Sequence, residues 1–303
     1  MAAPGLTFDE LFDAEFLRRL QGLSLRVAQA QKGGRLAEQR TSARGRGSEF
    51  ADFKPYVAGD DMRAIDWNIY RRLGRLFVRV FEEQQDMPVY FLVDVSASMF
   101  LEQPPRINAA LRATLGLAAI ALGQHDAVGL LPFSERLSPQ VKLLSGRNNL
   151  MRVARHLVEY EPAGGTALVA ALERLGQLGL RRGLVVVVSD FFDPAGIAAV
   201  VAAMQRLPHR LLLVPLVKAY DADPALHPAL HGDVLIDDGE SSPGIELSLD
   251  PALLQRYRQA YRDFERQLLD FSRSRGAGLL RIDADGDVLE QLAGPFGSGE
   301  LRL

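Results

Sequence analysis

Residues 89–98 read Val-Tyr-Phe-Leu-Val-Asp-Val-Ser-Ala-Ser, an apolar run that ends in one carboxylate and two hydroxyl side chains. Such a run is typical of a strand in a parallel sheet, because that strand is covered on both faces. Open α/β sheets bind ligands beyond the carboxyl ends of their strands, where Asp94, Ser96 and Ser98 would lie. Hard oxygen donors of this kind suit Mg²⁺. A Ser after a strand also commonly closes a turn or caps a helix, so the triplet alone leaves both interpretations open.

A second apolar run, residues 183–190, ends in Asp190 and is rich in Val. It predicts another central parallel strand, so that Asp94 and Asp190 leave the sheet at the same edge. Thr166 follows two glycines in a turn that opens an apolar helix. If the two strands are neighbours, Thr166 falls between them and five oxygen-bearing side chains converge. We therefore predict a site for Mg²⁺, with Mn²⁺ as an alternative, formed by Asp94, Ser96, Ser98, Thr166 and Asp190.

The pattern Asp-x-Ser-x-Ser, followed by a distant Thr and a distant Asp, resembles the metal-ion-dependent adhesion site of von Willebrand factor A domains. The preceding segment narrows the resemblance. Residues 46–50 read Arg-Gly-Ser-Glu-Phe, residues 56–67 read Tyr-Val-Ala-Gly-Asp-Asp-Met-Arg-Ala-Ile-Asp-Trp, and residues 76–82 read Leu-Phe-Val-Arg-Val-Phe-Glu. Together these motifs resemble domain-of-unknown-function family 58, von Willebrand A-like proteins that tend to accompany MoxR-type AAA+ ATPases.

The resemblance implies a non-enzymatic module that binds a protein partner through its metal. A MoxR-type ATPase, or a client that it remodels, is the implied partner. Two carboxylates only just neutralise a divalent cation, so an open coordination position can accept a carboxylate from that partner. The expected fold is a von Willebrand A-like α/β domain over residues 87–303, with an N-terminal helix and strand extension over residues 1–86.

The remaining sequence is organised in agreement with this fold. From residue 89 onward, strand-like runs alternate with helical periodicity, as a doubly wound and mostly parallel sheet requires. Residues 219–250 interrupt the alternation, and two short apolar runs around Asp238-Gly239 predict a hairpin insertion. Near the N-terminus, Thr7 and Glu10 form a capping box ahead of an amphipathic helix, and Gly33-Gly34 is expected to end that helix.

Residues 59–67 read Gly-Asp-Asp-Met-Arg-Ala-Ile-Asp-Trp and admit two interpretations. The structural one places Asp60 as the cap of a short helix and pairs Arg63 with Asp61 or Asp66. It also makes Trp67 a packing anchor. The alternative is a recognition surface near the metal.

Composition excludes several classes of function. Cysteine is absent, which excludes disulfides, thiolate zinc sites and cysteine nucleophiles. No apolar run approaches the ~20 residues that span a bilayer, and no signal peptide is recognisable, so we expect no membrane insertion and a cytoplasmic location. Arginines cluster between Arg18 and Arg46, but no aromatic residue is interleaved there to stack on bases, so we expect no nucleic-acid partner.

The alternative function is a metal-dependent phosphatase of the haloacid dehalogenase kind. Those enzymes also place an Asp after the first strand and carboxylates, such as Asp190 and Asp193, after a later one. Their acid is a second Asp two residues beyond the first, and here that position holds Ser96, a poor proton donor at neutral pH. They also use a Lys, and none occurs between Lys142 and Lys218.

Overall fold

The computed structural model describes residues 6–38, 44–82, 87–139, 141–227, 230, 232–236, 240, 244–298 and 301. Contacts divide the chain into two compact units, one formed by Met1–Lys32 together with Met87–Leu303 and the other by Gly33–Asp86. The described residues 6–32 thus belong to the larger unit. The division expected from the sequence, at residues 86 and 87, stays a prediction about separate domains.

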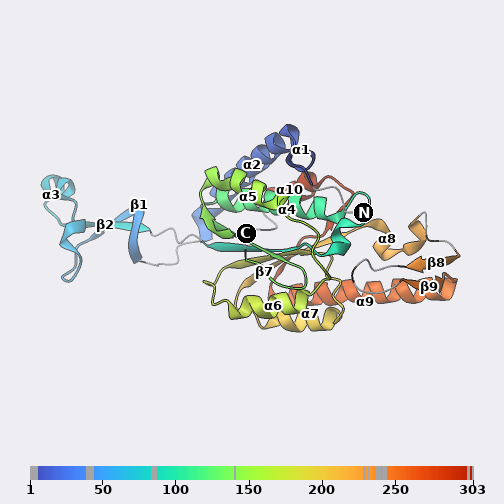
Figure 1. Cartoon of the computed structure of the whole chain (residues 1–303). Coiled ribbons are helices and arrows are strands. Elements are labelled where there is room, and N and C mark those ends of the chain that lie inside the picture. The colour runs from blue at the N-terminus through green and yellow to red at the C-terminus, as the bar shows by residue number, and fades with distance from the viewer. Residues whose placement is uncertain are drawn as a thin grey trace. The chain divides into compact units, whose positions relative to one another are not determined.

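The larger unit is built on a seven-stranded sheet in the order β10-β7-β6-β3-β4-β5, with β11 also paired to β7 (Figure 1). Its parallel strands are β3 (Pro88–Asp94), β4 (Ala127–Phe133), β6 (Leu184–Ser189), β7 (Arg210–Val217), β10 (Gly278–Leu279) and β11 (Ile282–Asp283). The edge strand β5 (Val141–Ser145) runs antiparallel to β4. Every residue of β3, β4 and β6 is buried, as their continuous apolar sequences require. The predicted α/β class with a mostly parallel sheet is confirmed.

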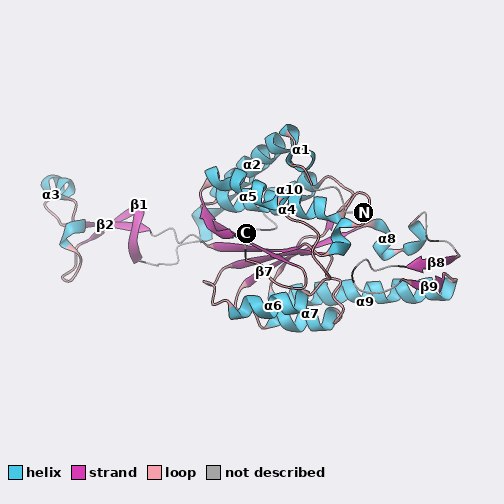
Figure 2. Cartoon of the chain, in the orientation of Figure 1, coloured by secondary structure: helices cyan, strands magenta, loops and turns pink. Residues whose placement is uncertain are grey.

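Helices cover both faces of this sheet (Figure 2). One face carries α1 (Phe8–Leu11), α2 (Ala14–Glu38), α4 (Arg106–Gly123), α5 (Leu150–Val158) and α10 (Val288–Gly297), and the other carries α6 (Leu168–Gln177), α7 (Ile197–Gln205) and α9 (Pro251–Arg275). Because successive strand residues point to opposite faces, Phe91 joins the first core and Leu92 the second. Within the described residues, no helix combines the length and apolar character needed to cross a membrane.

The predicted capping box of Thr7 and Glu10 is present, but the helix is interrupted after Leu11 and ends later than predicted. Thr7 Oγ1 donates to Glu10 Oε2 at 2.6 Å, but α1 ends at Leu11 and a new helix begins at Ala14. The expectation that Gly33-Gly34 ends the helix is wrong, since α2 continues to Glu38. A glycine inside a helix costs only ~1 kcal/mol, which the rest of a long helix can offset.

The insertion after β7 contains the predicted hairpin. A short helix, α8 (Ala219–Ala222), and a 3₁₀ turn, η4 (Pro224–Leu226), lead to β8 (Asp233–Ile236), which pairs antiparallel with β9 (Ile245–Ser248). The predicted turn residues, Asp238 and Gly239, lie outside the described residues.

The smaller unit is a two-stranded antiparallel ribbon, β1 (Arg44–Pro55) with β2 (Phe77–Glu82), joined by η1 (Met62–Ala64) and α3 (Trp67–Leu73). Asp61, not Asp60, caps η1 by accepting from Arg63 N at 3.0 Å. Asp60 instead accepts from Lys54 Nζ and from Val57 N.

Two further expectations for this block are wrong. Trp67 is 60% exposed and stacks edge-on against Tyr70, so it is not a packing anchor within the described residues. Asp66 caps α3 through the backbone N–H groups of Asn68 and Ile69, and the described part of the chain contains no ion pair from the exposed Arg63. Asp61 and Asp66 instead accept hydrogen bonds from nearby backbone N–H groups, as short polar side chains commonly do at helix starts.

Candidate metal centre

The candidate site lies where the strand order of the sheet reverses. From β3 the chain proceeds to β4 and β5 on one side, and later to β6 and β7 on the other. β3 and β6 are parallel neighbours, with Val89 opposite Leu184 and Val93 opposite Val188. Asp94 is the last residue of β3, and Asp190 directly follows β6. Open α/β sheets bind ligands at such a reversal, beyond the carboxyl ends of the strands.

Asp94 is fully buried and is held by hydroxyl and backbone donors. Its Oδ1 accepts from Ser96 N at 3.0 Å and from Ser96 Oγ at 2.7 Å, and its Oδ2 accepts from Ser189 Oγ at 2.6 Å. Burial raises the pKa of Asp94 to about 6, although the hydrogen bonds from Ser189 and Ser96 favour the charged form. The carboxylate is therefore an expensive buried charge in a fixed orientation.

The loop after β3 carries the two serines toward the loop that contains Thr166. Ser98 Oγ lies 3.2 Å from Ser96 Oγ, so the two hydroxyls share one side of the turn. Ala97 N donates to Gly164 O at 2.9 Å, and Ala163 N donates to Val95 O at 3.2 Å. These backbone hydrogen bonds hold the two loops together.

Thr166 is also buried, and its backbone N–H and hydroxyl donate to a carboxylate that the sequence analysis did not predict. Thr166 N donates to Glu240 Oε2, and Thr166 Oγ1 donates to Glu240 Oε1, each at 2.8 Å. Glu240 lies between the two strands of the hairpin insertion, 74 residues along the chain. Its negative charge also raises the pKa of Asp94, as a smaller contribution than burial.

Asp190 is partly exposed at the end of β6, and its Oδ1 accepts from Phe192 N at 3.0 Å. Burial and the charge of Asp94 raise the pKa of Asp190, whereas the positive charge of Arg106 lowers it. Asp190 directly follows Ser189, whose hydroxyl donates to Asp94, so the two carboxylates lie at the ends of neighbouring strands.

The structure thus unites most of the five predicted residues but links them in different ways. Asp94, Ser96 and Ser98 form one hydrogen-bonded cluster, Asp190 is coupled to Asp94 by charge, and Thr166 lies on the adjoining loop with Glu240 upon it. Whether these groups bind a metal stays a prediction. Within the described residues, no group of three or more His, Asp or Glu is arranged to hold an ion, so hydroxyl oxygens would have to complete a site.

Two residues of this site were missed by the sequence analysis. The contact of Ser189 with Asp94 could have been predicted once the register of β3 and β6 was assumed. Val188 lies opposite Val93, so the next residues along these parallel strands, Ser189 and Asp94, also lie opposite one another. Glu240 left no signal, since its position depends on the path of a long insertion.

Comparison with known proteins identifies the family. The family described as "Protein of unknown function DUF58" matches residues 52–267, more than two thirds of the chain. The chain belongs to the DUF58 family. The resemblance inferred from the motifs is confirmed at this level.

Relatives of this DUF58 chain include uncharacterized proteins of Mycobacterium bovis and Mycobacterium tuberculosis. Each is 26% identical over 295 residues, which cover 95% of this chain and 91% of the relative. Among solved structures, the conserved hypothetical protein BatB from Bacteroides thetaiotaomicron is 17% identical with a TM-score of 0.41, covering 71% of this chain and 98% of that one. An aerotolerance-related membrane protein from Bacteroides fragilis is 18% identical with a TM-score of 0.39, covering 71% and 100% respectively.

A buried charge network lies beside the candidate site. The guanidinium of Arg106, at the start of α4, forms an ion pair with Asp221 and also donates to Leu216 O and to Glu102. Lys218 Nζ donates to Pro104 O at 2.6 Å and lies 3.2 Å from both Glu102 and Asp285. These contacts fasten the loop before α4 to the end of β7, and so help to hold the sheet edge in place.

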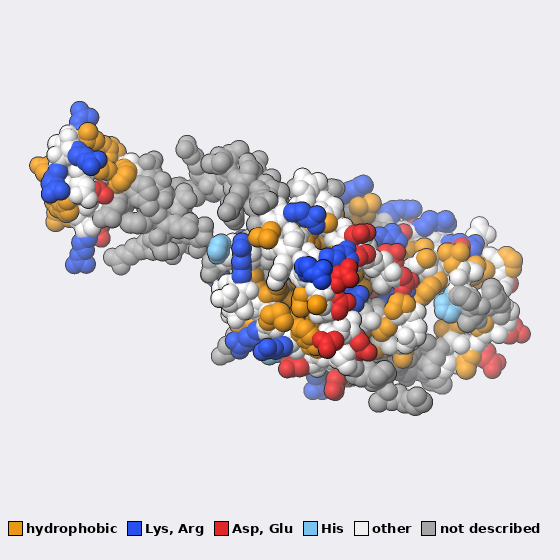
Figure 3. Space-filling model, turned by 90° about the horizontal axis from the view of Figure 1, so that it is seen from above, with side chains coloured by type: hydrophobic (Ala, Val, Ile, Leu, Met, Phe, Trp, Pro, Cys, Tyr) orange, Lys and Arg blue, Asp and Glu red, His pale blue; other side chains and the backbone are white. Residues whose placement is uncertain are grey.

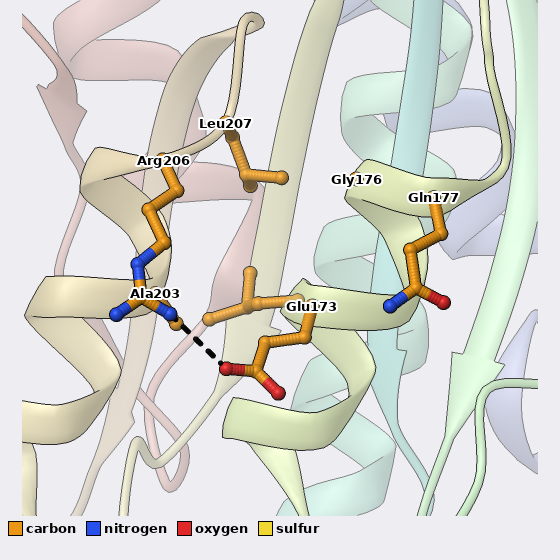
Figure 4. Close-up of a pocket in the computed structure, with 7 residues that line it drawn as sticks. Glu173, Gly176, Gln177, Ala203, Arg206 and Leu207 are labelled. Carbon is orange, nitrogen blue, oxygen red and sulfur yellow. Dashed lines mark hydrogen bonds and ion pairs between the residues drawn. The ribbon is translucent and has the colours of Figure 1, made fainter.

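Two hollows lie away from this edge. One, of about 350 Å³, lies between α6 and α7, and Glu173 and Arg206 form an ion pair 3.2 Å long across its mouth (Figure 4). The other, of about 200 Å³, lies between α2 and α10. Both side chains of the first pair are at least half exposed, so this hollow is a shallow surface groove.

The surface of the larger unit mixes both charge signs. On the face shown in Figure 3, Lys and Arg side chains lie beside Asp and Glu side chains over the described residues. Phosphate backbones are bound by concentrated positive charge, which that face does not display.

Proposed function

We propose that this DUF58 chain is a metal-dependent protein-binding module of the von Willebrand A-like type, not an enzyme. The observation that carries the proposal is the convergence of Asp94, Ser96 and Ser98 after β3 with Asp190 after β6, at the reversal of the strand order. Thr166 adjoins them on a loop joined by backbone hydrogen bonds.

The chemistry of the donor set fits a hard divalent cation. All the candidate ligands are oxygens of carboxylates or hydroxyls, which Mg²⁺ and Mn²⁺ prefer over the nitrogen and sulfur ligands typical of zinc. Asp94 and Asp190 raise the free energy of the metal-free site by mutual repulsion, and a cation between like charges removes that cost. Ser96, Ser98 and Thr166 would then hold the ion, while the two aspartates supply charge directly or through water.

The bound cation would supply one chemical feature, a positive charge that attracts an acidic side chain. The chain's own residues would orient that ion and retain it. From the family resemblance, we propose a MoxR-type AAA+ ATPase or its client as the protein partner, in the cytoplasm, with no nucleic acid and no membrane insertion involved.

The phosphatase alternative is disfavoured by the surroundings of Asp94. Asp94 is fully buried, and the position two residues beyond it, where such phosphatases place their acid, holds Ser96, a poor proton donor whose hydroxyl donates to Asp94 itself. The buried Lys218 near this edge is engaged by Pro104, Glu102 and Asp285.

The experiment is affinity capture from the native cells on immobilised protein, with Mg²⁺ in one arm and chelator in the other. We expect an AAA+ ATPase to be retained by the wild type only in Mg²⁺, and not by Asp94→Asn. Equal retention in chelator would refute a metal-dependent contact. Turnover of a generic phosphate ester that requires both Mg²⁺ and Asp94 would favour the phosphatase instead.

A further inference from the structure

The carboxylate of Glu240 joins the candidate metal centre to the hairpin insertion. Both of its oxygens accept hydrogen bonds from Thr166, one from the backbone N–H and one from the hydroxyl. A carboxylate that comes from a distant part of the chain and accepts hydrogen bonds from this threonine has the chemistry expected of an external acidic ligand. Here that ligand belongs to the same chain.

The absence of a side chain at Gly165 leaves room for this approach. A Cβ atom at Gly165 would lie 3.2 Å from Glu240 Oε2 and 3.7 Å from Glu240 Cβ, which is tighter than ordinary contact for the first atom. The carboxylate is therefore held against the backbone of the Thr166 loop.

Glu240 thus adds a third negative charge beside the loop of Thr166, although Asp94, Asp190 and Glu240 do not by themselves form a ready-made group of metal ligands. Asp94 and Asp190 interact through their charges, and Glu240 interacts with Asp94 in the same way. At close range in a partly buried site such repulsion costs on the order of kcal/mol, and a divalent ion converts it into attraction. The carboxylate of Glu240 therefore stabilises the ion-bound form of the site relative to the metal-free form.

The described apolar side chains of the hairpin lie largely at the surface. Leu235, Ile236 and Ile245 are 67%, 40% and 61% exposed, so their side chains contribute little to a core. A two-stranded ribbon is marginally stable alone. The contact with Thr166 therefore anchors the described part of the hairpin to the body of the domain.

We propose that Glu240 is a built-in ligand of the cation, and that the hairpin insertion thereby occupies the position that a partner's carboxylate would take. The inference rests on the proposed function and adds its regulation. The site is closed by its own insertion, and an acidic partner binds by displacing Glu240. Displacement would also release the exposed apolar face of the hairpin from its anchor.

The test uses Mn²⁺ and Mg²⁺ alone as probes of the full chain. Glu240→Gln keeps the shape and one acceptor oxygen but removes the charge. Glu246→Gln removes the same charge from exposed β9 of the same hairpin and serves as the matched control. Calorimetric titration gives the Mn²⁺ affinity, water-proton relaxation reports water on the bound Mn²⁺, and hydrogen exchange of residues 233–248 reports hairpin docking.

We expect Glu240→Gln to weaken Mn²⁺ binding at least about tenfold, since even loss of an outer-shell partner costs 10–100-fold. Relaxation per bound Mn²⁺ should increase, because water replaces the lost carboxylate. Mg²⁺ should protect the hairpin from exchange in the wild type and in Glu246→Gln but not in Glu240→Gln.

Two results overturn the inference and are distinguishable. If the wild type binds Mn²⁺ and Glu240→Gln binds it with unchanged affinity, relaxation and hairpin exchange, Glu240 is not a ligand, although the proposed function survives. If the wild type binds neither ion, both proposals fail together.

Discussion

Asp94→Asn is the sharpest perturbation of the candidate site, because it removes one charge with almost no change in shape. Asparagine retains Oδ1 as acceptor for both donors of Ser96, and its amide group replaces the oxygen that accepts from Ser189. One lost hydrogen bond costs about 1 kcal/mol. Relief of the repulsion with Asp190 offsets that cost, so the variant should be about as stable as the wild type in chelator.

The metal response of the wild type can be given a magnitude. An ion present at a hundred times its dissociation constant, and bound by the folded state alone, adds about 2.7 kcal/mol to the free energy of unfolding. The unit that holds the site has about 250 residues, so its unfolding entropy is about 0.5 kcal/mol/K. The melting temperature should therefore rise by about 5 °C in saturating Mg²⁺ or Mn²⁺.

The assay is thermal unfolding in chelator and across a millimolar Mg²⁺ series. We expect the 5 °C rise in the wild type and in Glu173→Gln, a control in the groove between α6 and α7, and no rise in Asp94→Asn. A wild type that does not respond at any concentration would end the metal hypothesis. A rise of equal size in Asp94→Asn would show that the ion binds elsewhere.

Three further predictions concern the framework around the site. Asp221→Ala leaves the buried guanidinium of Arg106 without its nearest carboxylate, so urea unfolding should show a loss of about 3–5 kcal/mol, and a loss below about 1 kcal/mol would contradict a buried pair. Gly183→Ala would place a Cβ 2.1 Å from Pro88 O and should lower the free energy of unfolding by about 1–3 kcal/mol. In Gly22→Ala, in α2, the new Cβ meets no atom within 4 Å and should raise the free energy of unfolding by about 0.5–1 kcal/mol. Equal effects of the two substitutions in the same unfolding assay would refute the close packing of Gly183 against Pro88. Arg63→Ala should change stability by less than about 0.5 kcal/mol, because that side chain is exposed, and a clear drop in melting temperature would restore the structural ion pair expected from the sequence.

Local pattern was sufficient for much of the fold. Residues 89–93 and 184–188 are continuous apolar runs, which are typical of strands buried on both faces, so their place in the sheet followed from composition. Because parallel strands end at a common edge, the approach of Asp190 to Asp94 followed as soon as the two strands were taken as neighbours. The hairpin over 233–248 was likewise signalled by its short apolar runs.

Exposure within the smaller unit was less predictable. Residues 44–55 form β1 despite their glycines and charges, since the partner strand β2 supplies the hydrogen bonds. Trp67 lies on the exposed face of α3, although its size favours burial. Secondary-structure propensity reflects a residue and its neighbours in sequence. Burial depends instead on whether distant parts of the chain pack against that residue.

The sequence alone determined the two central strands and the oxygen-bearing side chains at their carboxyl ends, because each depends on residues only a few positions apart. Only the tertiary structure decided which groups those ligands contact. Ser189 reaches Asp94 across 95 residues, Glu240 reaches Thr166 across 74, and Asp221 reaches Arg106 across 115. Such contacts depend on the path of every intervening loop. The entropic cost of closing a loop rises only slowly with its length, so partners at very different separations along the chain are almost equally accessible. The sequence around each residue therefore does not identify its partner.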